Sequence, residues 1–354
     1  MKRNNSLYTR GNGIKFEKIS EMPVVFIRLF KNFKFLFLTL AACCEGIIFS
    51  GMAAFMTKLL LQQFGLGPKK QAIYKATLAI PSSLIGILGG GWAIKYFGMN
   101  LQQMLVMIVC LVSLSFPCIG AMFIYCDNND LVGLSESDNN MIEKIKLQSE
   151  CNKDCDCDDT FFFPVCGHDN LTYFSACHAG CSRKEVKDSI DMFYDCKCIL
   201  NKPSSGPEAV EGFCMDNCPS LVFFIMLVFT YQTLSFFCVI PTITATLRVV
   251  HGDVRSLAIA LQWVMGRLLG TIPGPLLFGK AIDESCGYWQ RNSDGSLGNC
   301  LHYDHLTLSR NLACLMFFSK GLQITFFAIA LKLAIKTQRE RMAEDPGLVR
   351  STIW

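Results

Sequence analysis

Six long apolar segments, separated by polar stretches, organise this chain of 354 residues. Each holds about 20 residues or more with few charges, which is the length an α-helix needs to cross the ~30 Å hydrocarbon core of a bilayer. The pattern therefore predicts an all-α membrane protein with six transmembrane helices. The segments cover approximately residues 35–56, 72–94, 101–125, 219–247, 256–282 and 311–335.

The polar stretches give the predicted domain organisation. Residues 1–34 form a basic segment, 35–125 hold three spans, 126–218 form an insert, 219–335 hold three further spans, and 336–354 form a tail. The first 20 residues contain neither the apolar core nor the small-residue cleavage site of a secretory signal, so we expect no cleaved signal peptide.

Composition agrees with a membrane protein and excludes several other classes. Apolar residues make up 51% of the chain, and the net charge of +4 is spread without a basic patch, which gives no indication of nucleic-acid binding. The sequence shows no Gly-rich phosphate loop, nucleophile elbow or HExxH motif. We therefore predict neither an enzyme nor an ATP-driven pump, and expect no cofactor or metal.

The insert indicates which side of the membrane is outside. Eight cysteines lie within the 48 residues from Cys151 to Cys198, a density that is stable as disulfides in an oxidising compartment. With the insert outside, both termini are cytoplasmic, and the cytoplasmic segments hold fifteen Lys and Arg against five in the short outer loops. This bias follows the positive-inside rule. We expect a multi-pass protein of the plasma membrane.

Thirteen cysteines then lie on the outer side, and an odd number leaves one unpaired. Cys126, at the membrane edge, is our candidate for the unpaired thiol. Zinc bound by Cys155-Asp156-Cys157 and Cys196-Lys197-Cys198 is an alternative, but these spacings differ from the usual two-residue gaps. The predicted disulfide cysteines are Cys151, Cys155, Cys157, Cys166, Cys177, Cys181, Cys196, Cys198, Cys214, Cys218, Cys286 and Cys300.

Part of the insert resembles a Kazal-type fold, in which disulfides hold a short helix and a hairpin together. The resemblance is carried by Pro164-Val165-Cys166-Gly167, by Asn170-Leu171-Thr172-Tyr173, and by Ser175, Cys177 and Cys181. A Kazal-like module between membrane spans is typical of organic anion transporting polypeptides, the solute carrier organic anion family. Asn170-Leu171-Thr172 is also an N-glycosylation sequon on the expected outer side.

The later spans are similar to that family too. The matching stretches are Arg255-Ser256-Leu257-Ala258, Arg267-Leu268-Leu269-Gly270, Ile272-Pro273-Gly274-Pro275 and Gly279-Lys280-Ala281-Ile282-Asp283, followed by Cys286 and Trp289. The resemblance implies the major-facilitator fold, but family members have twelve spans and this chain matches only the second six. We therefore expect either a fragment or splice form, or a half that pairs with a missing amino-terminal half or a second copy.

A few charged residues within the spans are the candidates for substrate binding. Arg267 lies near the middle of its span, where a charge is costly and usually faces a cavity or a partner. Its guanidinium suits a carboxylate or sulfate, and the resemblance places it in the transport cavity. Lys320 lies at a similar depth, Lys75 nearer the outer surface, and Trp263 could line the apolar part of the site.

Glu45 is the acidic residue deep in a span, and we expect it to be the counter-charge of Arg267. An alternative role for Glu45 is proton coupling. Histidines lie outside the predicted spans, so a histidine proton relay has no support in this half.

The resemblance implies sodium-independent transport of large amphipathic anions, such as prostanoids, steroid conjugates, bile salts or thyroid hormones, by ATP-free alternating access. One alternative is a non-transporting six-span protein that partners or regulates a full-length transporter. Another is a membrane-tethered protease inhibitor that uses the loop 158–165. Packing of Phe161-Phe162-Phe163 onto the module would argue against the inhibitor.

Overall fold

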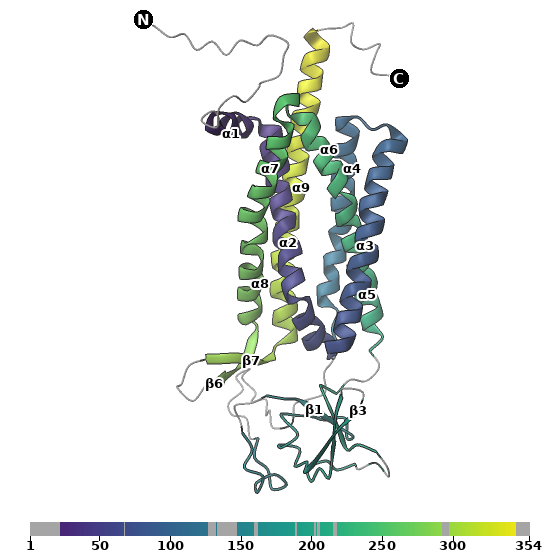
Figure 1. Cartoon of the computed structure of the whole chain (residues 1–354), viewed down its shortest axis with the longest axis vertical. Coiled ribbons are helices and arrows are strands. Elements are labelled where there is room, and N and C mark those ends of the chain that lie inside the picture. The colour runs from purple at the N-terminus through teal and green to yellow at the C-terminus, as the bar shows by residue number, and fades with distance from the viewer. Residues whose placement is uncertain are drawn as a thin grey trace, which may run out of the picture.

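The fold was obtained as a computed structural model. It describes residues 22–66, 68–126, 132, 147–158, 162–187, 190–201, 203, 206–214, 218–291 and 297–344. Long helices form a bundle, with a small β-rich domain at one end (Figure 1). The short helix α1 (Met22–Lys31) and the C-terminal end of α9 (His305–Glu344) lie at the opposite end.

Five helical stretches of the described chain are long and apolar enough to cross a membrane: Phe33–Phe64, Lys70–Phe97, Leu101–Phe123, Ser220–Val249 and His305–Glu340. They correspond to α2 (Phe33–Phe64), α3 (Pro68–Phe97), α4 (Leu101–Ser115) with the 3₁₀ turn η2 (Pro117–Phe123), α5 (Ser220–Phe237) with α6 (Val239–Val249), and α9. The chain is therefore a multi-pass membrane protein.

The predicted fifth span is interrupted in the structure. After the turn η3 (Gly252–Val254), the chain forms α7 (Arg255–Gly266), the π-helical turn η4 (Arg267–Thr271) and α8 (Pro273–Asp283). The backbone N–H of Ile272 donates to the carbonyl oxygen of Arg267 at 3.0 Å, a five-residue spacing. Pro273 and Pro275 lack the N–H groups that would continue regular α-helical bonding. The interruption begins at Arg267, the arginine predicted from the sequence to bind substrate.

Helix α2 is the centre of the bundle, because it contacts α3, α9 and all three parts of the interrupted span. Glycines allow helix backbones to approach each other closely at several places in the bundle. A Cβ atom added to Gly270 would lie 2.7 Å from the carbonyl oxygen of Cys43, and one added to Gly86 would lie 2.8 Å from that of Thr233. Small residues allow such backbone contact between membrane helices. The glycines thus fix α2 against η4 and α3 against α5.

Helix α9 begins with a side-chain cap. The Asp304 carboxylate accepts hydrogen bonds from the backbone N–H of Leu306 and of Thr307, both at 3.2 Å, and from the Thr307 hydroxyl. Burial acts to raise the pKa of Asp304, but these hydrogen bonds lower it below its usual value. The cap explains why α9 starts at His305, well before the apolar segment predicted from residue 311.

The insert contains a five-stranded antiparallel sheet of order β2-β1-β5-β4-β3. Its strands are β1 (Val165–Gly167), β2 (Thr172–Tyr173), β3 (Arg183–Lys187), β4 (Ile190–Tyr194) and β5 (Ala209–Glu211). Its disulfides are Cys151–Cys198, Cys157–Cys177, Cys166–Cys214 and Cys181–Cys196. The buried core of the domain, which includes Val165, Tyr173 and Phe193, is small, so the cross-links supply much of the stability that such a domain needs.

A separate hairpin precedes α9 at the same end of the bundle. It consists of β6 (Cys286–Arg291) and β7 (Leu297–Tyr303), paired antiparallel and joined by the disulfide Cys286–Cys300. The hairpin returns the chain from α8 to the start of α9.

The structure corrects two cysteine predictions. Cys126 forms a disulfide with Cys218, and Cys155 has a free thiol instead. The Cys126 N–H donates to the carbonyl oxygen of Gln63 at 3.0 Å, which holds it at the C-terminal end of α2, beside the β-rich domain. Cys218 lies directly before α5. The two ends of the insert therefore meet at the bundle. The neighbouring Cys157 forms its disulfide with Cys177, and Cys155 keeps a free thiol.

Candidate substrate-binding face

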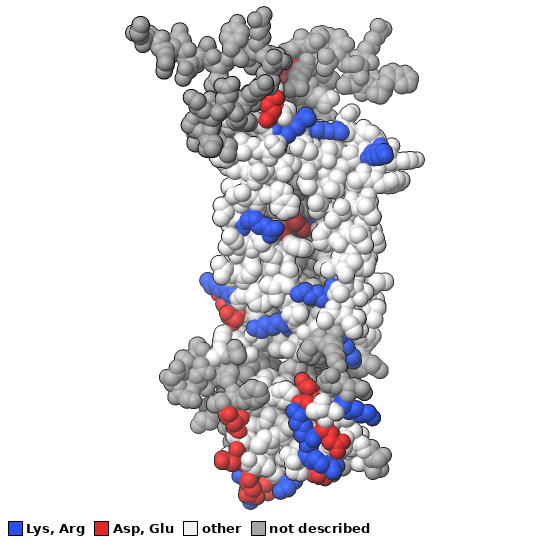
Figure 2. Space-filling view, viewed as in Figure 1, with Lys and Arg blue, Asp and Glu red and all other residues white. Residues whose placement is uncertain are grey.

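Charged residues are distributed unevenly among the long helices. Helices α4 and α5 and the turn η2 contain none, and α6 contains only Arg248 in its last turn, whereas α2, α3, α7 to α8 and α9 contain the others. Figure 2 shows basic side chains over the lower half of the face that α8, α2 and α3 form in Figure 1. An uncharged helix suits hydrocarbon, and intramembrane charges usually face a cavity or a partner. The α8, α2 and α3 face is therefore the candidate site.

Arg267 lies on this side of the bundle at the first residue of the π-helical turn, and its side chain is exposed. Its guanidinium carbon is 5.8 Å from the centre of the Trp263 ring, one turn earlier, within the range of a cation–π contact. Trp263 is 56% exposed. Within the described chain no acidic group forms an ion pair with Arg267. The pair presents a planar cation and an aromatic surface together.

Glu45 pairs with Lys320 rather than with Arg267, which corrects the expected counter-charge. The Lys320 ammonium is 2.7 Å from the Glu45 carboxylate, donates to the Ser235 hydroxyl at 3.3 Å, and lies 4.8 Å from the centre of the Tyr231 ring. The Lys320 side chain is 0% exposed, and that of Glu45 is 26% exposed. Lys320 is thus enclosed between α2, α5 and α9, so it is not placed to contact a substrate directly.

Glu45 nevertheless lies close to the arginine-bearing turn. A Cβ atom added to the next residue, Gly46, would be 3.5 Å from the carbonyl oxygen of Gly266 and 3.3 Å from the Cα of Gly270. Those residues flank Arg267 along the chain. The partly exposed Glu45 and the exposed Arg267 therefore belong to adjoining segments at one depth. Figure 2 shows a basic and an acidic side chain beside one another halfway along this face.

Lys75 lies nearer the β-rich end and is half-buried. Its ammonium donates to the carbonyl oxygen of Ala53 on α2 at 2.9 Å, which links α3 to α2. Ala53 is eight residues from Glu45, or about 12 Å along the helix at ~1.5 Å per residue. The structure therefore separates Lys75 from the level of Arg267, and gives it a helix-to-helix hydrogen bond.

Sequence reasoning missed two parts of this region. The π-helical turn was not predicted, although the prolines after Gly270 are a signal for irregular backbone. The second is the polar set around Lys320, formed by Tyr231, Ser235 and Gln323. Tyr231 and Ser235 are four residues apart in a strongly apolar helix, a spacing that places them on one face.

The β-rich domain shows no comparable binding site among its described residues. Phe162 packs against Phe174 with ring centres 5.0 Å apart, and Phe163 belongs to the domain's core. Phe161 lies outside the described residues. Cys157, Cys196 and Cys198 are in disulfides and so cannot bind zinc as thiolates. Phe162 and Phe163 thus fill the domain instead of forming an exposed inhibitory loop.

Comparison with known proteins identifies the family. The Organic Anion Transporter Polypeptide (OATP) family model matches residues 2–308. The chain belongs to this family. It is a family of transporters, not of enzymes, which agrees with the membrane-spanning helices and the six disulfides described above.

Several members of the solute carrier organic anion transporter family are similar to this OATP-family chain. Member 4C1 of Mus musculus is 32% identical over 339 residues, which cover 94% of this chain and 47% of the relative. Member 4C1 of Homo sapiens is 33% identical over 332 residues (90% and 45%). Member 4A1 of Mus musculus is 31% identical over 318 residues (88% and 44%). The chain spans about half the length of the relatives that it matches.

Proposed function

We propose that this chain supplies the second half of an organic anion transporter. Its partner is an amino-terminal half or a second copy, and the two halves together form a path between the two sides of the membrane. The substrates are large amphipathic anions, the class that includes prostanoids, steroid conjugates, bile salts and thyroid hormones. Transport is sodium-independent and proceeds by alternating access without ATP.

The observation that carries the proposal is the exposed pair of Arg267 and Trp263 on the charged face. A guanidinium binds a carboxylate or sulfate with two parallel hydrogen bonds, and the indole ring offers apolar contact to the body of the same molecule. This combination matches an amphipathic anion. An exposed cation within the membrane that forms no ion pair in the described part of the chain needs a second surface or an aqueous cavity to face.

The other predicted binding residues take different roles in this proposal. Glu45 repels a second anion and keeps Lys320 neutralised, while Lys320 holds Glu45 in place. Lys75 contributes a positive field between Arg267 and the outer surface, where long-range attraction favours the entry of anions. The π-helical turn gives Arg267 a backbone able to adjust as the two halves move.

Uptake measurements test the proposal. The chain is reconstituted in proteoliposomes alone, or together with the part of the mouse 4C1 relative that it does not match. We expect uptake of a labelled steroid sulfate only by the combined preparation, driven without ATP or sodium. If the combined preparation is correctly assembled but inactive, and the chain instead alters the uptake of a full-length relative, the chain is a regulator rather than a transporter half.

For the architecture, we propose six spans with α7, η4 and α8 as the interrupted fifth. The insert is a Kazal-like extracellular domain, and both termini lie in the cytoplasm of a plasma-membrane protein. We keep the domain boundaries predicted from the sequence, at residues 34, 125, 218 and 335, although helix α9 continues past the last of them to Glu344. Disulfides in the insert support its position in an oxidising compartment.

Glycosylation tests this sidedness. Asn170 is exposed in the turn between β1 and β2, with φ of 65°, a left-handed conformation that asparagine tolerates. We expect the expressed chain to lose apparent mass on treatment with an N-glycosidase, and the variant Asn170→Gln to lack that shift. The basic segment contains a second sequon, Asn4-Asn5-Ser6, so the control Asn4→Gln should leave the shift unchanged. A shift that survives Asn170→Gln but not Asn4→Gln would reverse the proposed topology.

A further inference from the structure

The short helix α1 differs from the long helices in its direction. It lies roughly perpendicular to the long helices and to the side of one end of the bundle, beside the first turn of α2 (Figure 1). Val25 and Leu29 are buried against Val250, Val254 and Ala258. The Asn32 side-chain amide, between α1 and α2, donates to the carbonyl oxygen of Val249 at 3.2 Å. These contacts fix α1 at the level where α2 enters the membrane.

The rest of the α1 surface is divided between apolar and basic residues. At about 100° per residue, Phe26 and Phe30 lie on one side of the Val25 and Leu29 face, and Arg28 lies on the other. Ile27 is 58% exposed, and Arg28 and Lys31 are exposed cations. The helix contains no acidic residue. The bundle therefore covers only one stripe of an amphipathic, purely cationic helix.

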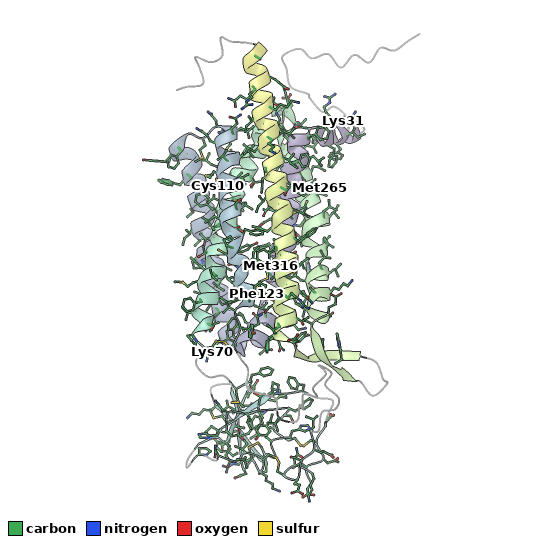
Figure 3. The ribbon with its side chains drawn as sticks, turned by 180° about the vertical axis from the view of Figure 1, so that it is seen from behind. Lys31, Lys70, Cys110, Phe123, Met265 and Met316 are labelled. Carbon is green, nitrogen blue, oxygen red and sulfur yellow. A yellow bond between two sulfur atoms is a disulfide. The ribbon has the colours of Figure 1, made fainter. Side chains whose placement is uncertain are left out.

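The surroundings of α1 suit a membrane surface. Figure 3 places Lys31 at the opposite end of the bundle from Lys70. At the same end, Trp92, Tyr96 and Phe97 of α3 form a mutually packed and exposed aromatic group. Exposed tryptophan and tyrosine gather where helices leave the hydrocarbon, and basic residues there attract anionic lipid. These features place α1 at the depth expected for the headgroup region of the bilayer.

We propose that α1 is an interfacial helix that binds acidic phospholipids, with Arg28 and Lys31 on the lipid phosphate and carboxylate groups. Phe26, Ile27 and Phe30 reach the acyl chains of the same leaflet. The bound lipid positions the corner formed by α1, α6 and α7, because Val25 and Leu29 pack on residues between those helices. This inference is independent of the transport proposal.

Lipid selectivity of the purified full chain tests it. The protein is equilibrated with equal amounts of phosphatidylserine and phosphatidylcholine, and the retained lipids are measured by native mass spectrometry. The wild-type chain should enrich phosphatidylserine. Each cation near an acidic surface contributes ~1 kcal/mol, so the variant Arg28→Gln/Lys31→Gln should lower the enrichment by up to about 30-fold. The variant Arg28→Lys/Lys31→Arg, which keeps both charges, should retain it.

Two controls make the result decisive. The variant Lys187→Gln/Arg310→Gln removes two exposed cations from the other end of the molecule, so it should keep the enrichment. Free phosphoserine should not compete with the lipid if the acyl chains contribute. Efficient competition would indicate a soluble phosphate site. Equal retention of both lipids by the wild-type chain, or equal enrichment in the double-glutamine variant, would overturn the proposal and leave protein as the covering partner.

Discussion

The variant Glu45→Gln is expected to destabilise the helical bundle by about 3–5 kcal/mol, because it leaves the buried Lys320 ammonium without a counter-charge. Lys320 is 0% exposed and is enclosed between α2, α5 and α9. Ser235 can accept one of its hydrogen bonds, but a neutral hydroxyl does not replace a carboxylate. Either the Lys320 ammonium must then lose its proton, or the helices around Lys320 must separate.

The converse variant, Lys320→Met, should destabilise the bundle less than Glu45→Gln does. Lys320→Met replaces the buried cation by an apolar side chain of similar length and leaves Glu45, which is 26% exposed and can recruit water. The double variant Glu45→Gln/Lys320→Met should be more stable than Glu45→Gln alone, since removal of both charges from a buried pair is often nearly neutral. This order of stabilities distinguishes a charge effect from a simple packing defect.

Stability is measured as the fraction of detergent-solubilised protein that stays monodisperse after heating. The cell-surface abundance of each variant is measured alongside. The matched control is the ion pair of Lys280 and Glu284 on the exposed end of α8, 3.8 Å apart and four residues apart in sequence. Loss of an exposed pair of this kind is worth about 0–1 kcal/mol. A Glu45→Gln variant as heat-stable as the Glu284→Gln control would show that Lys320 does not depend on Glu45.

Five of the six predicted spans coincide with helical stretches of the described chain that are long and apolar enough to cross a membrane, whereas the predicted fifth span is interrupted at η4. The pattern also pointed to Arg267, Glu45 and Lys320, since charges in such segments are few. It could not decide which charges pair. Glu45 is separated from Lys320 by 275 residues, and their contact depends on the packing of α9 behind α2. The position of a residue in the sequence predicts its depth along the membrane normal. It does not predict which neighbouring helix its side chain faces.

The cysteine pairing shows the same limit. Density of cysteines predicted the disulfides, but the choice of the unpaired thiol rested on Cys126 being near the membrane. In the structure that location brings Cys126 to Cys218, 92 residues away, because both residues adjoin ends of bundle helices. The proximity of loop ends is a property of the assembled helices. The interruption at η4 was hidden for a related reason, since π-helical turns have no simple sequence period.

Arg267→Ala is expected to abolish uptake of organic anions by a complete transporter assembly at normal surface abundance. Loss of one partner from a hydrogen-bonded charge pair in a desolvated site costs roughly 2–5 kcal/mol, which corresponds to a fall of about 30-fold or more in apparent affinity. Folding should be preserved, because the Arg267 side chain is exposed and forms no ion pair among the described residues. Uptake of a labelled anion, normalised to surface protein, measures the effect.

Conservative and control variants separate the parts of this role. Arg267→Lys keeps the charge but loses the planar pair of donors and the stacking on Trp263, so it should retain only weak uptake. Trp263→Ala should weaken uptake of bulky aromatic anions more than that of small ones, because it removes apolar contact. Arg255→Gln, twelve residues earlier at the start of α7, should leave uptake unchanged. If Arg267→Ala transports normally at equal surface abundance, the anion must bind elsewhere on the charged face, and the proposed role of the π-helical turn falls with it.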